Sequence, residues 1–148
     1  MTMRISDAGV ELVKRWEGLR LRAYLCPAGV PTIGYGHTKT VTARDVNRKR
    51  LITHDEAEAL LRSDLEAFEA VVNKTPGLTQ HQFDACVSLA FNIGASAFQR
   101  STLRRLLLAG QHAAAAEQFG RWIRAKGQVL PGLISRRADE RRLFLISE

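Results

Sequence analysis

Strand signals are confined to one short stretch of this chain, and that confinement limits its fold more than any other feature. Between residues 23 and 52, Val, Ile, Thr and Tyr are interrupted by prolines and glycines, a pattern typical of short strands joined by turns. From Thr53 onward, apolar residues recur with the period of a helix. Because strands do not alternate with helices along the chain, the sequence predicts an α+β fold and not an α/β fold.

Helix boundaries are indicated by capping residues. Thr53 with Glu56, and Thr79 with Gln82, fit the capping box, in which two side chains satisfy the first free N–H groups of a helix. The polar and basic residues 38–50 are expected to form an exposed loop or hairpin. The expected helices cover residues 7–16, 54–73, 80–93, 102–109, 112–125 and Pro131 to Leu145.

The length and composition of the chain suit one domain. It has 148 residues, of which 45% are hydrophobic, so it can bury a sizeable core. We expect a single domain over residues 1–148, in which an N-terminal helix precedes a small lobe over about residues 12–60. A long helix then leads into a helical lobe over about residues 75–148.

The charge of the chain favours a polyanionic partner. Lys and Arg number 22 against 15 Asp and Glu, which gives a formal net charge of +7. Nucleic acid, an anionic membrane surface and the bacterial cell wall are all candidates, and a basic surface that only maintains solubility is a further interpretation. The basic residues are dispersed and are not clustered with stacking aromatics, which speaks against a nucleic-acid partner.

Cysteine and histidine usage gives no sign of a metal site. The cysteines are Cys26 and Cys86, no CxxC motif occurs, and the four histidines are scattered, so no metal is expected. A Cys26–Cys86 disulfide is possible but is not implied by the spacing. The N-terminus lacks the apolar run of a signal peptide and no segment is long enough to span a bilayer, so the chain is expected to be made in the cytoplasm.

Three residues of the N-terminal part could carry chemistry. Glu17 lies at the end of the first expected helix, and a glycosidase needs a carboxylic acid that donates a proton to the departing sugar oxygen. Cys26 and Thr32 follow in the strand region. Each also has an ordinary structural interpretation: a surface carboxylate, a small buried thiol and a strand threonine.

The spacing of these residues carries a family resemblance. Eight residues separate Glu17 from Cys26, and five residues separate Cys26 from Thr32. This spacing, together with the neighbouring residues, resembles the active-site segment of phage lysozymes, glycoside hydrolase family 24. The resemblance covers nearly the whole chain and implies a lysozyme-like fold, with a long helix between a small lobe that contains a β-hairpin and a helical lobe. The similar segments are residues 17–24, 32–38, 55–61, 91–94, 98–103 and 130–137.

The sequence departs from the more common family pattern at Cys26. Many members carry Asp at this position, which is ionised near pH 7, whereas a thiol with an ordinary pKa of about 8.5 is mostly neutral. The resemblance implies that Cys26 and Thr32 serve the face of the sugar ring opposite Glu17. A thiolate could attack the anomeric carbon or stabilise positive charge there, and a neutral thiol could help hold water, so retention and inversion both stay open.

Family position also suggests roles for residues outside this group. Tyr24 and Phe91 are expected to border the cleft and to bind substrate. His37 could act as a base, but the family match favours a structural role in which it pairs with Asp64 on the long helix. We therefore predict that His37 and Asp64 lie within hydrogen-bond distance of each other.

Several residues of the helical part have two interpretations. Arg136 or Arg137 could approach the catalytic acid from the last helix, or both could be solvated charges. Cys86 lies on the same helical face as apolar residues and is expected in the core. Phe119 and Trp122 are expected in the core and not as platforms for stacking sugars.

The function that these features favour is hydrolysis of the β-1,4 bond between N-acetylmuramic acid and N-acetylglucosamine in peptidoglycan, by an endolysin that needs no cofactor. The resemblance implies host-cell lysis by a monomer that a holin releases from the cytoplasm to the wall. The alternatives are a lytic transglycosylase that forms anhydro products, a non-enzymatic basic binding module and an inactive relative.

Overall fold

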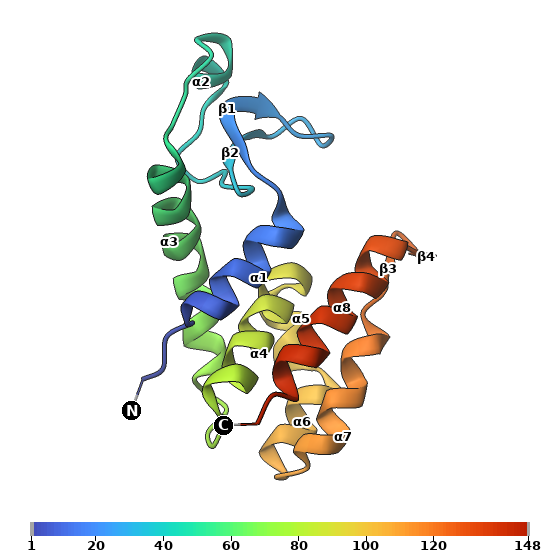
Figure 1. Ribbon diagram of the computed structural model, residues 1–148. Coiled ribbons are helices and arrows are strands. Elements are labelled where there is room, and N and C mark those ends of the chain that lie inside the picture. Colours follow the sequence, from blue (N-terminus) through green and yellow to red (C-terminus); the bar gives the residue numbers. More distant parts are fainter. Residues whose placement is uncertain (1, 148) are drawn as a thin grey trace. The chain divides into compact units, whose positions relative to one another are not determined.

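The computed structural model describes residues 2–147 and confirms the predicted α+β class (Figure 1). It divides into two compact units, one of Val13–Glu66 and one of the residues up to Leu12 together with those from Ala67 onward. The helices are α1 (Asp7–Glu17), α2 (Ala43–Asn47), α3 (His54–Val72), α4 (Gln80–Ile93), α5 (Ala95–Gln99), α6 (Thr102–Leu108), α7 (His112–Glu117), the 3₁₀ helix η1 (Gln118–Arg121) and α8 (Pro131–Phe144). The strands are β1 (Arg20–Leu25), β2 (Pro31–Gly34), β3 (Arg124–Ala125) and β4 (Gln128–Val129).

The unit Val13–Glu66, called here the hairpin unit, is built on the antiparallel pair β1–β2, which lies beside α2 in Figure 1. Tyr24 is the cross-strand partner of Thr32, and the pairing is irregular between Arg20 and Tyr24. Ala23 of β1 and Ile33 of β2 are buried in a small apolar core. That core consists of Ala23, Ile33, Val41, Ile52 and Ala57.

The expectation that residues 38–50 form only a loop or hairpin was wrong. Residues 43–47 form the short helix α2, whose first turn is closed by a capping box between Thr42 and Asp45. The Thr42 side chain accepts a hydrogen bond from the Asp45 N–H, and the Asp45 side chain accepts one from the Thr42 N–H. The local polarity suggested a loop, but the same polar residues provide the caps that allow a single helical turn to form.

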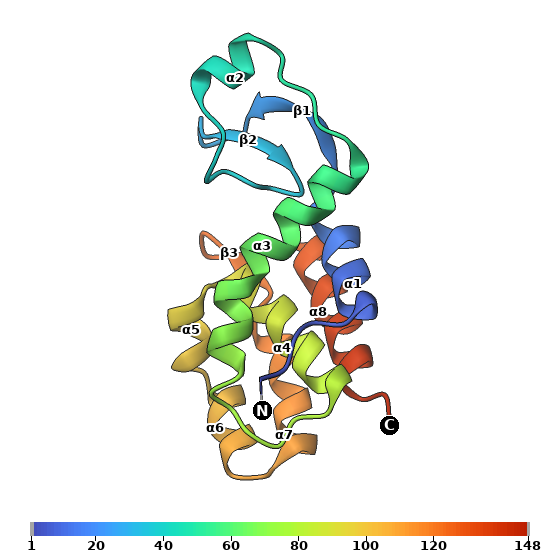
Figure 2. The same ribbon diagram turned by 90° about the vertical axis from the view of Figure 1, so that its left-hand side faces the viewer.

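The other unit, called here the helical unit, is organised around α4. Eight consecutive residues of this helix, from Phe83 to Ala90, are buried. A helix that is buried on every side must be covered by other elements, and α8 runs alongside it, as Figures 1 and 2 show. Cys86 has no exposed surface, which confirms the prediction that it lies in the core.

Buried carboxylates fix the N-terminal segment to the helical unit. The Ile5 N–H donates a hydrogen bond to Glu69 Oε2 at 2.7 Å, and the Ser6 N–H donates one to Asp84 Oδ1 at 3.0 Å. At the start of α1, a Cβ added to Gly9 would lie 2.8 Å from the Cβ of Asp84 and 2.5 Å from Cγ1 of Ile5. Glycine at position 9 therefore permits a backbone approach that no larger residue allows.

A buried ionic group joins α8 to α4. Glu140 is fully buried and pairs with Arg136 at 3.2 Å and with Arg137 at 2.7 Å. The Ser88 hydroxyl of α4 donates a hydrogen bond of 2.5 Å to the same carboxylate. Arg137 also donates to the carbonyl oxygen of Trp122 at 3.0 Å. These contacts show that neither arginine is a solvated surface charge.

The helix expected over residues 112–125 was wrong in its second half. The α-helix ends at Glu117, the 3₁₀ helix η1 follows, and the chain then turns through the hairpin β3–β4. Lys126 and Gly127 have φ values of 52° and 79°, the left-handed backbone that a two-residue hairpin turn requires. The short helix α5 was also missed, because its five residues carry no helical period that can be recognised.

The remaining helix predictions are confirmed to within a residue or two, a normal uncertainty for helix ends. Gly18, Gly94 and Gly110 have positive φ values, the backbone conformation that commonly ends a helix. Phe119 is fully buried, as predicted, but Trp122 is only half-buried, so its assignment to the core was wrong. Among the helices of residues 2–147, none has both the length and the apolar composition that crossing a bilayer requires.

Candidate active site

Glu17 is the last residue of α1 and belongs to the hairpin unit. Its side chain is half-buried, and Gly18 follows with a φ of 73°, which ends the helix. Oε1 of Glu17 would lie 3.5 Å from a Cβ added to Gly36, so the carboxylate contacts the turn that follows β2. The end of α1 and the turn after β2 therefore position the carboxyl group of Glu17, which the sequence analysis predicted to act as an acid.

The turn of the β1–β2 hairpin places Cys26 directly after β1. Its N–H donates to the Val30 carbonyl at 3.0 Å, and its own carbonyl accepts from the Gly29 N–H at 2.7 Å. The backbone N–H groups of Val30 and Ala28 lower the pKa of the Cys26 thiol, and the Thr32 hydroxyl contributes a smaller effect in the same direction. Hydrogen bonds to sulfur favour its charged form, so this turn stabilises a thiolate.

Thr32 brings a hydroxyl to the same end of the hairpin. The residue is buried, with 3% of its surface exposed, and its Oγ1 donates to the Val30 carbonyl at 2.8 Å. A hydroxyl has one proton but can rotate, so it can donate either to this carbonyl or to the Cys26 sulfur. The sequence prediction placed Cys26 and Thr32 together, and the hairpin does bring these two residues into contact.

His37 has a structural environment, and its predicted pairing with Asp64 is confirmed. Nδ1 of His37 lies 2.8 Å from Oδ2 of Asp64. Nε2 accepts a hydrogen bond from the Thr40 N–H at 3.2 Å, so Nδ1 carries the proton and donates to Asp64. Backbone hydrogen bonds in both directions also join His37 to Ile33. With both ring nitrogens engaged, His37 fixes the turn that contains Gly36.

A second connection holds the end of α1, and sequence reasoning missed it. Lys14, one turn before Glu17, pairs with Glu58 of α3, which Arg62 also contacts at 3.1 Å. Lys14 also lies over the ring of Tyr35, 5.8 Å from its centroid. Hydrogen bonds from Lys14 and then from Arg62 lower the pKa of Glu58. Residues 14 and 58 are far apart in sequence, so no local pattern indicates that they pair. Only the four-residue spacing of Glu58 and Arg62 on one helix indicates an ion pair in the sequence.

The two aromatic residues proposed to bind substrate belong to different units. Tyr24 is half-buried on β1, and the guanidinium of Arg20 lies 4.1 Å from its ring centroid. Phe91 is half-buried on α4 and packs edge to face against Phe68, with ring centroids 5.3 Å apart. That Tyr24 and Phe91 bind substrate remains a prediction. The approach of Arg136 or Arg137 to Glu17 also remains a prediction.

The described residues contain no disulfide and no candidate metal site. Cys26 and Cys86 are both free thiols. Within residues 2–147, no three His, Cys, Asp or Glu side chains gather in a way that could hold a metal ion. Near its hairpin turn and the end of α1, the hairpin unit presents a carboxyl group at Glu17, a thiol at Cys26 and a hydroxyl at Thr32.

Comparison with known proteins gives one consistent result. The phage lysozyme family model matches residues 14–140. The endolysin of Acyrthosiphon pisum secondary endosymbiont phage 1 is 48% identical over 149 aligned positions, covering 96% of this chain and 98% of the relative.

Solved structures agree with the sequence match. A mutant of P22 lysozyme has a TM-score of 0.88 at 42% identity, and the muramidase domain of SpmX from Asticaccaulis excentricus has a TM-score of 0.87 at 43% identity. Each alignment covers 97% of this chain and 99% of the solved chain.

Proposed function

The chain belongs to the phage lysozyme family, and on that premise we propose that Glu17, Cys26 and Thr32 are the catalytic residues of an endolysin. The protein is a glycoside hydrolase that acts on bacterial peptidoglycan. The bond cleaved is the β-1,4 linkage between N-acetylmuramic acid and N-acetylglucosamine. The observation that carries the proposal is the hairpin turn, which surrounds the Cys26 sulfur with N–H and O–H donors.

Glu17 acts as the general acid. Its carboxyl proton is transferred to the glycosidic oxygen as the bond from this oxygen to the anomeric carbon breaks, which leaves positive charge on the ring. The contact with Gly36 and the pairing of Lys14 with Glu58 support this role, because they restrain both ends of the last turn of α1. A restrained proton donor loses little entropy when the substrate binds.

Cys26 acts as a thiolate on the opposite side of the sugar ring. Its negative charge stabilises the positive charge that develops at the anomeric carbon. The thiolate then accepts a proton from the water that adds to this carbon, and Thr32 orients that water. The lowered pKa of Cys26 supports the charged form over the neutral thiol that an ordinary cysteine presents at neutral pH. Direct addition of water predicts inversion, whereas attack by sulfur predicts retention.

The test is the release of reducing ends from purified peptidoglycan by wild type and variants. We expect Glu17→Gln to lower turnover about a thousandfold, the range that general acid catalysis supplies. Glu11→Gln, on the same helix, is the matched control and should retain wild-type turnover. Cys26→Ser should lose most activity, and Cys26→Asp should keep more of it. In Cys26→Asp, the acidic limit of the pH–activity profile should move to lower pH, because a carboxyl group ionises at lower pH than a thiol.

Other results would contradict the proposal. Full turnover by Glu17→Gln would remove this residue from the mechanism, and full turnover by Cys26→Ser would leave the thiol with a structural role. Proton NMR of the first product distinguishes inversion from retention. Anhydro sugars in place of reducing ends would show a transglycosylase and not a hydrolase.

We also propose that the enzyme acts as a monomer and reaches the wall after a holin opens the cytoplasmic membrane. The kinship with endolysins supports this role in lysis. Expression of the chain with and without a holin in a bacterial host tests the proposal, since lysis should require both proteins. Light scattering of the purified protein tests its oligomeric state.

A further inference from the structure

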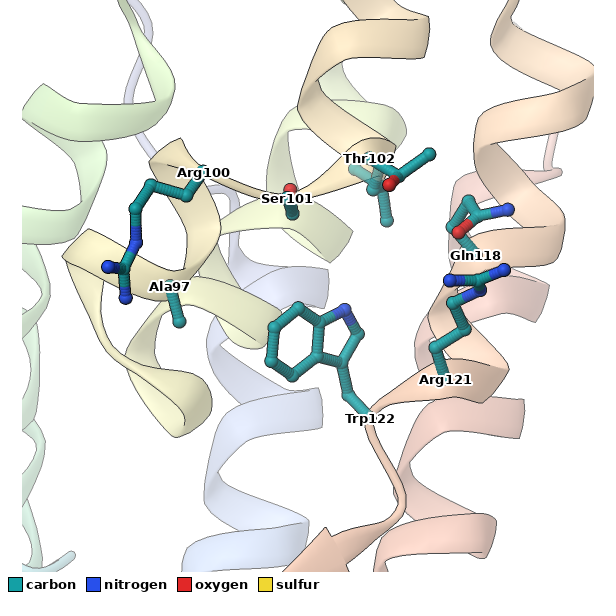
Figure 3. Close-up of a pocket in the computed structure, with 8 residues that line it drawn as sticks. Ala97, Arg100, Ser101, Thr102, Gln118, Arg121 and Trp122 are labelled. Atoms are coloured by element: carbon teal, nitrogen blue, oxygen red, sulfur yellow. The ribbon is translucent and has the colours of Figure 1, made fainter.

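Lys14 is enclosed to an unusual degree for a lysine. Only 18% of its side chain is exposed, and its ammonium pairs with the carboxylate of Glu58 on α3. In the helical unit, by contrast, Arg100 and Arg121 line a cavity on either side of Trp122 (Figure 3), and neither pairs with a carboxylate of residues 2–147. Ordering a lysine side chain costs conformational entropy, so the contacts that enclose Lys14 have to offset that cost.

Glu58 is itself held in place by two cations. Nζ of Lys14 pairs with Oε1, and Nε of Arg62 donates to Oε2 at 3.1 Å, so both carboxylate oxygens are engaged. Hydrogen bonds from Lys14 and then from Arg62 lower the pKa of Glu58, so its carboxylate is charged at neutral pH. The ammonium of Lys14 is therefore held against an acceptor that α3 keeps in one place.

The turn that Glu17 contacts has little rigidity of its own. Tyr35 stands between Gly34 and Gly36, whose φ values are 69° and 82°. Because glycine loses more backbone freedom on ordering than any other residue, a turn with two glycines needs side-chain contacts to keep one conformation. Tyr35 carries the side chain between them, and the Lys14 ammonium lies 5.8 Å from the centroid of its ring, within the range of a cation–π interaction.

These contacts meet at the last turn of α1, within the hairpin unit. The Gly18 N–H donates to the Lys14 carbonyl at 3.2 Å, so the backbone of Lys14 closes the turn that carries Glu17. Oε1 of Glu17 would in turn lie 3.5 Å from a Cβ added to Gly36. We propose that Lys14 is a positioning residue, which joins the end of α1 to the turn around Tyr35 and so fixes the carboxyl group of Glu17 for proton transfer. The proposal rests on the role of Glu17 as the general acid proposed above.

A displaced acid lowers turnover and not substrate affinity. Proton transfer requires the acid and the glycosidic oxygen within hydrogen-bond distance, and a displacement of about 1 Å can lower a rate about a hundredfold. The Lys14 ammonium is already engaged by Glu58 and Tyr35, so its removal should act through the position of Glu17. We therefore expect a lower kcat with an unchanged KM.

The experiment measures kcat and KM from the release of reducing ends by the full chain, with soluble, uncross-linked peptidoglycan strands as substrate. Lys14→Met keeps the length of the side chain but loses its charge, and should lower kcat about tenfold with KM within about twofold of wild type. Lys14→Arg can restore both contacts, because a guanidinium pairs with a carboxylate and lies over an aromatic ring, so it should keep at least about half of the wild-type kcat.

A matched control and a second readout separate positioning from general effects. Lys74→Met removes the same charge from an exposed lysine after α3 and should leave kcat unchanged. Amide hydrogen exchange, followed by NMR, reports on the last turn of α1 without any substrate. In Lys14→Met, the Gly18 N–H should exchange about tenfold faster than in wild type, whereas the amide of buried Leu65 on α3 should be unchanged because only a local opening is involved.

Three results would overturn the proposal. They are an unchanged kcat in Lys14→Met, an equal loss of kcat in Lys74→Met, and an unchanged exchange rate of the Gly18 N–H. A wild-type enzyme that released no reducing ends would refute the proposed function instead. Exchange at Gly18 would then still decide whether Lys14 holds the last turn of α1.

Discussion

The two units of the molecule place a cysteine in opposite environments. In the hairpin unit, Cys26 is half-buried, and N–H groups of its own turn lower the pKa of the thiol. In the helical unit, Cys86 is enclosed within α4, where burial and then the negative charge of Glu140 raise the pKa of the thiol far above its ordinary value. The hairpin unit thus leaves the thiol of Cys26 partly accessible, whereas the helical unit encloses its thiol and uses buried polar groups to hold helices together.

The largest effect on stability is expected from Glu140→Gln. The substitution leaves the buried guanidiniums of Arg136 and Arg137 without their carboxylate, and such a loss costs about 3–5 kcal/mol. Urea unfolding at pH 7 measures it. Glu117→Gln is the control, because this exposed carboxylate pairs with Arg141 at the surface and should contribute less than about 1 kcal/mol. Equal losses in the two variants would show that the buried ionic group does not hold the helical unit.

The thiols themselves provide the next comparison. At neutral pH and in the folded protein, Cys26 should react with iodoacetamide at least about a hundredfold faster than Cys86, because only Cys26 combines exposure with a stabilised thiolate. Mass spectrometry of peptides after timed quenching gives both rates in one sample. Similar rates would mean that the hairpin turn does not activate its thiol or that the helical unit opens readily.

Gly9→Ala tests how tightly the helical unit is packed. The new methyl group would meet the side chains of Ile5 and Asp84 well within van der Waals distance, so we expect a loss of about 1–3 kcal/mol. Gly120→Ala is the matched control, since a Cβ at position 120 meets nothing within 4 Å. Thermal unfolding of both variants should show a lower Tm only for Gly9→Ala. An unchanged Tm would mean that the start of α1 can move away from α4.

The smallest effect is expected from Glu58→Gln in the hairpin unit. The pKa of Glu58 is lowered in the folded state, so its contribution is present above the unfolded pKa of about 4.3 and is lost as the pH falls through the folded value. Because the pair with Lys14 is partly exposed, we expect less than about 0.5 kcal/mol at pH 7. Unfolding over a series of pH values should show a difference from wild type that is present at pH 7 and decreases as the pH falls through the folded pKa of Glu58. A difference that did not decrease as the pH was lowered would point to lost packing instead.

The accuracy of the sequence predictions differed with the kind of feature. Long helices were predicted well, because capping boxes such as that of Thr79 and Gln82 and stops such as Gly94 are local signals. Short helices were not predicted well. The helices α5 and η1 are too short to show a helical period of apolar residues, and α2 depends on one capping box within a polar stretch. The small hairpin β3–β4 was not predicted, because residues 112–125 were interpreted as one helix. Gly120 and Gly127 are unfavourable in a helix and spoke against that interpretation.

By itself, the sequence determined the fold class and the family and led to the proposal of Glu17, Cys26 and Thr32 as catalytic residues, because element boundaries and motif spacing are properties of neighbouring residues. Only the tertiary structure decided which charges are buried and which remain unpaired. Arg137 and Arg121 look alike in sequence, yet one is enclosed with Glu140 and the other lines a cavity. The reason is physical: burial and pairing depend on groups distant in the chain that packing brings together.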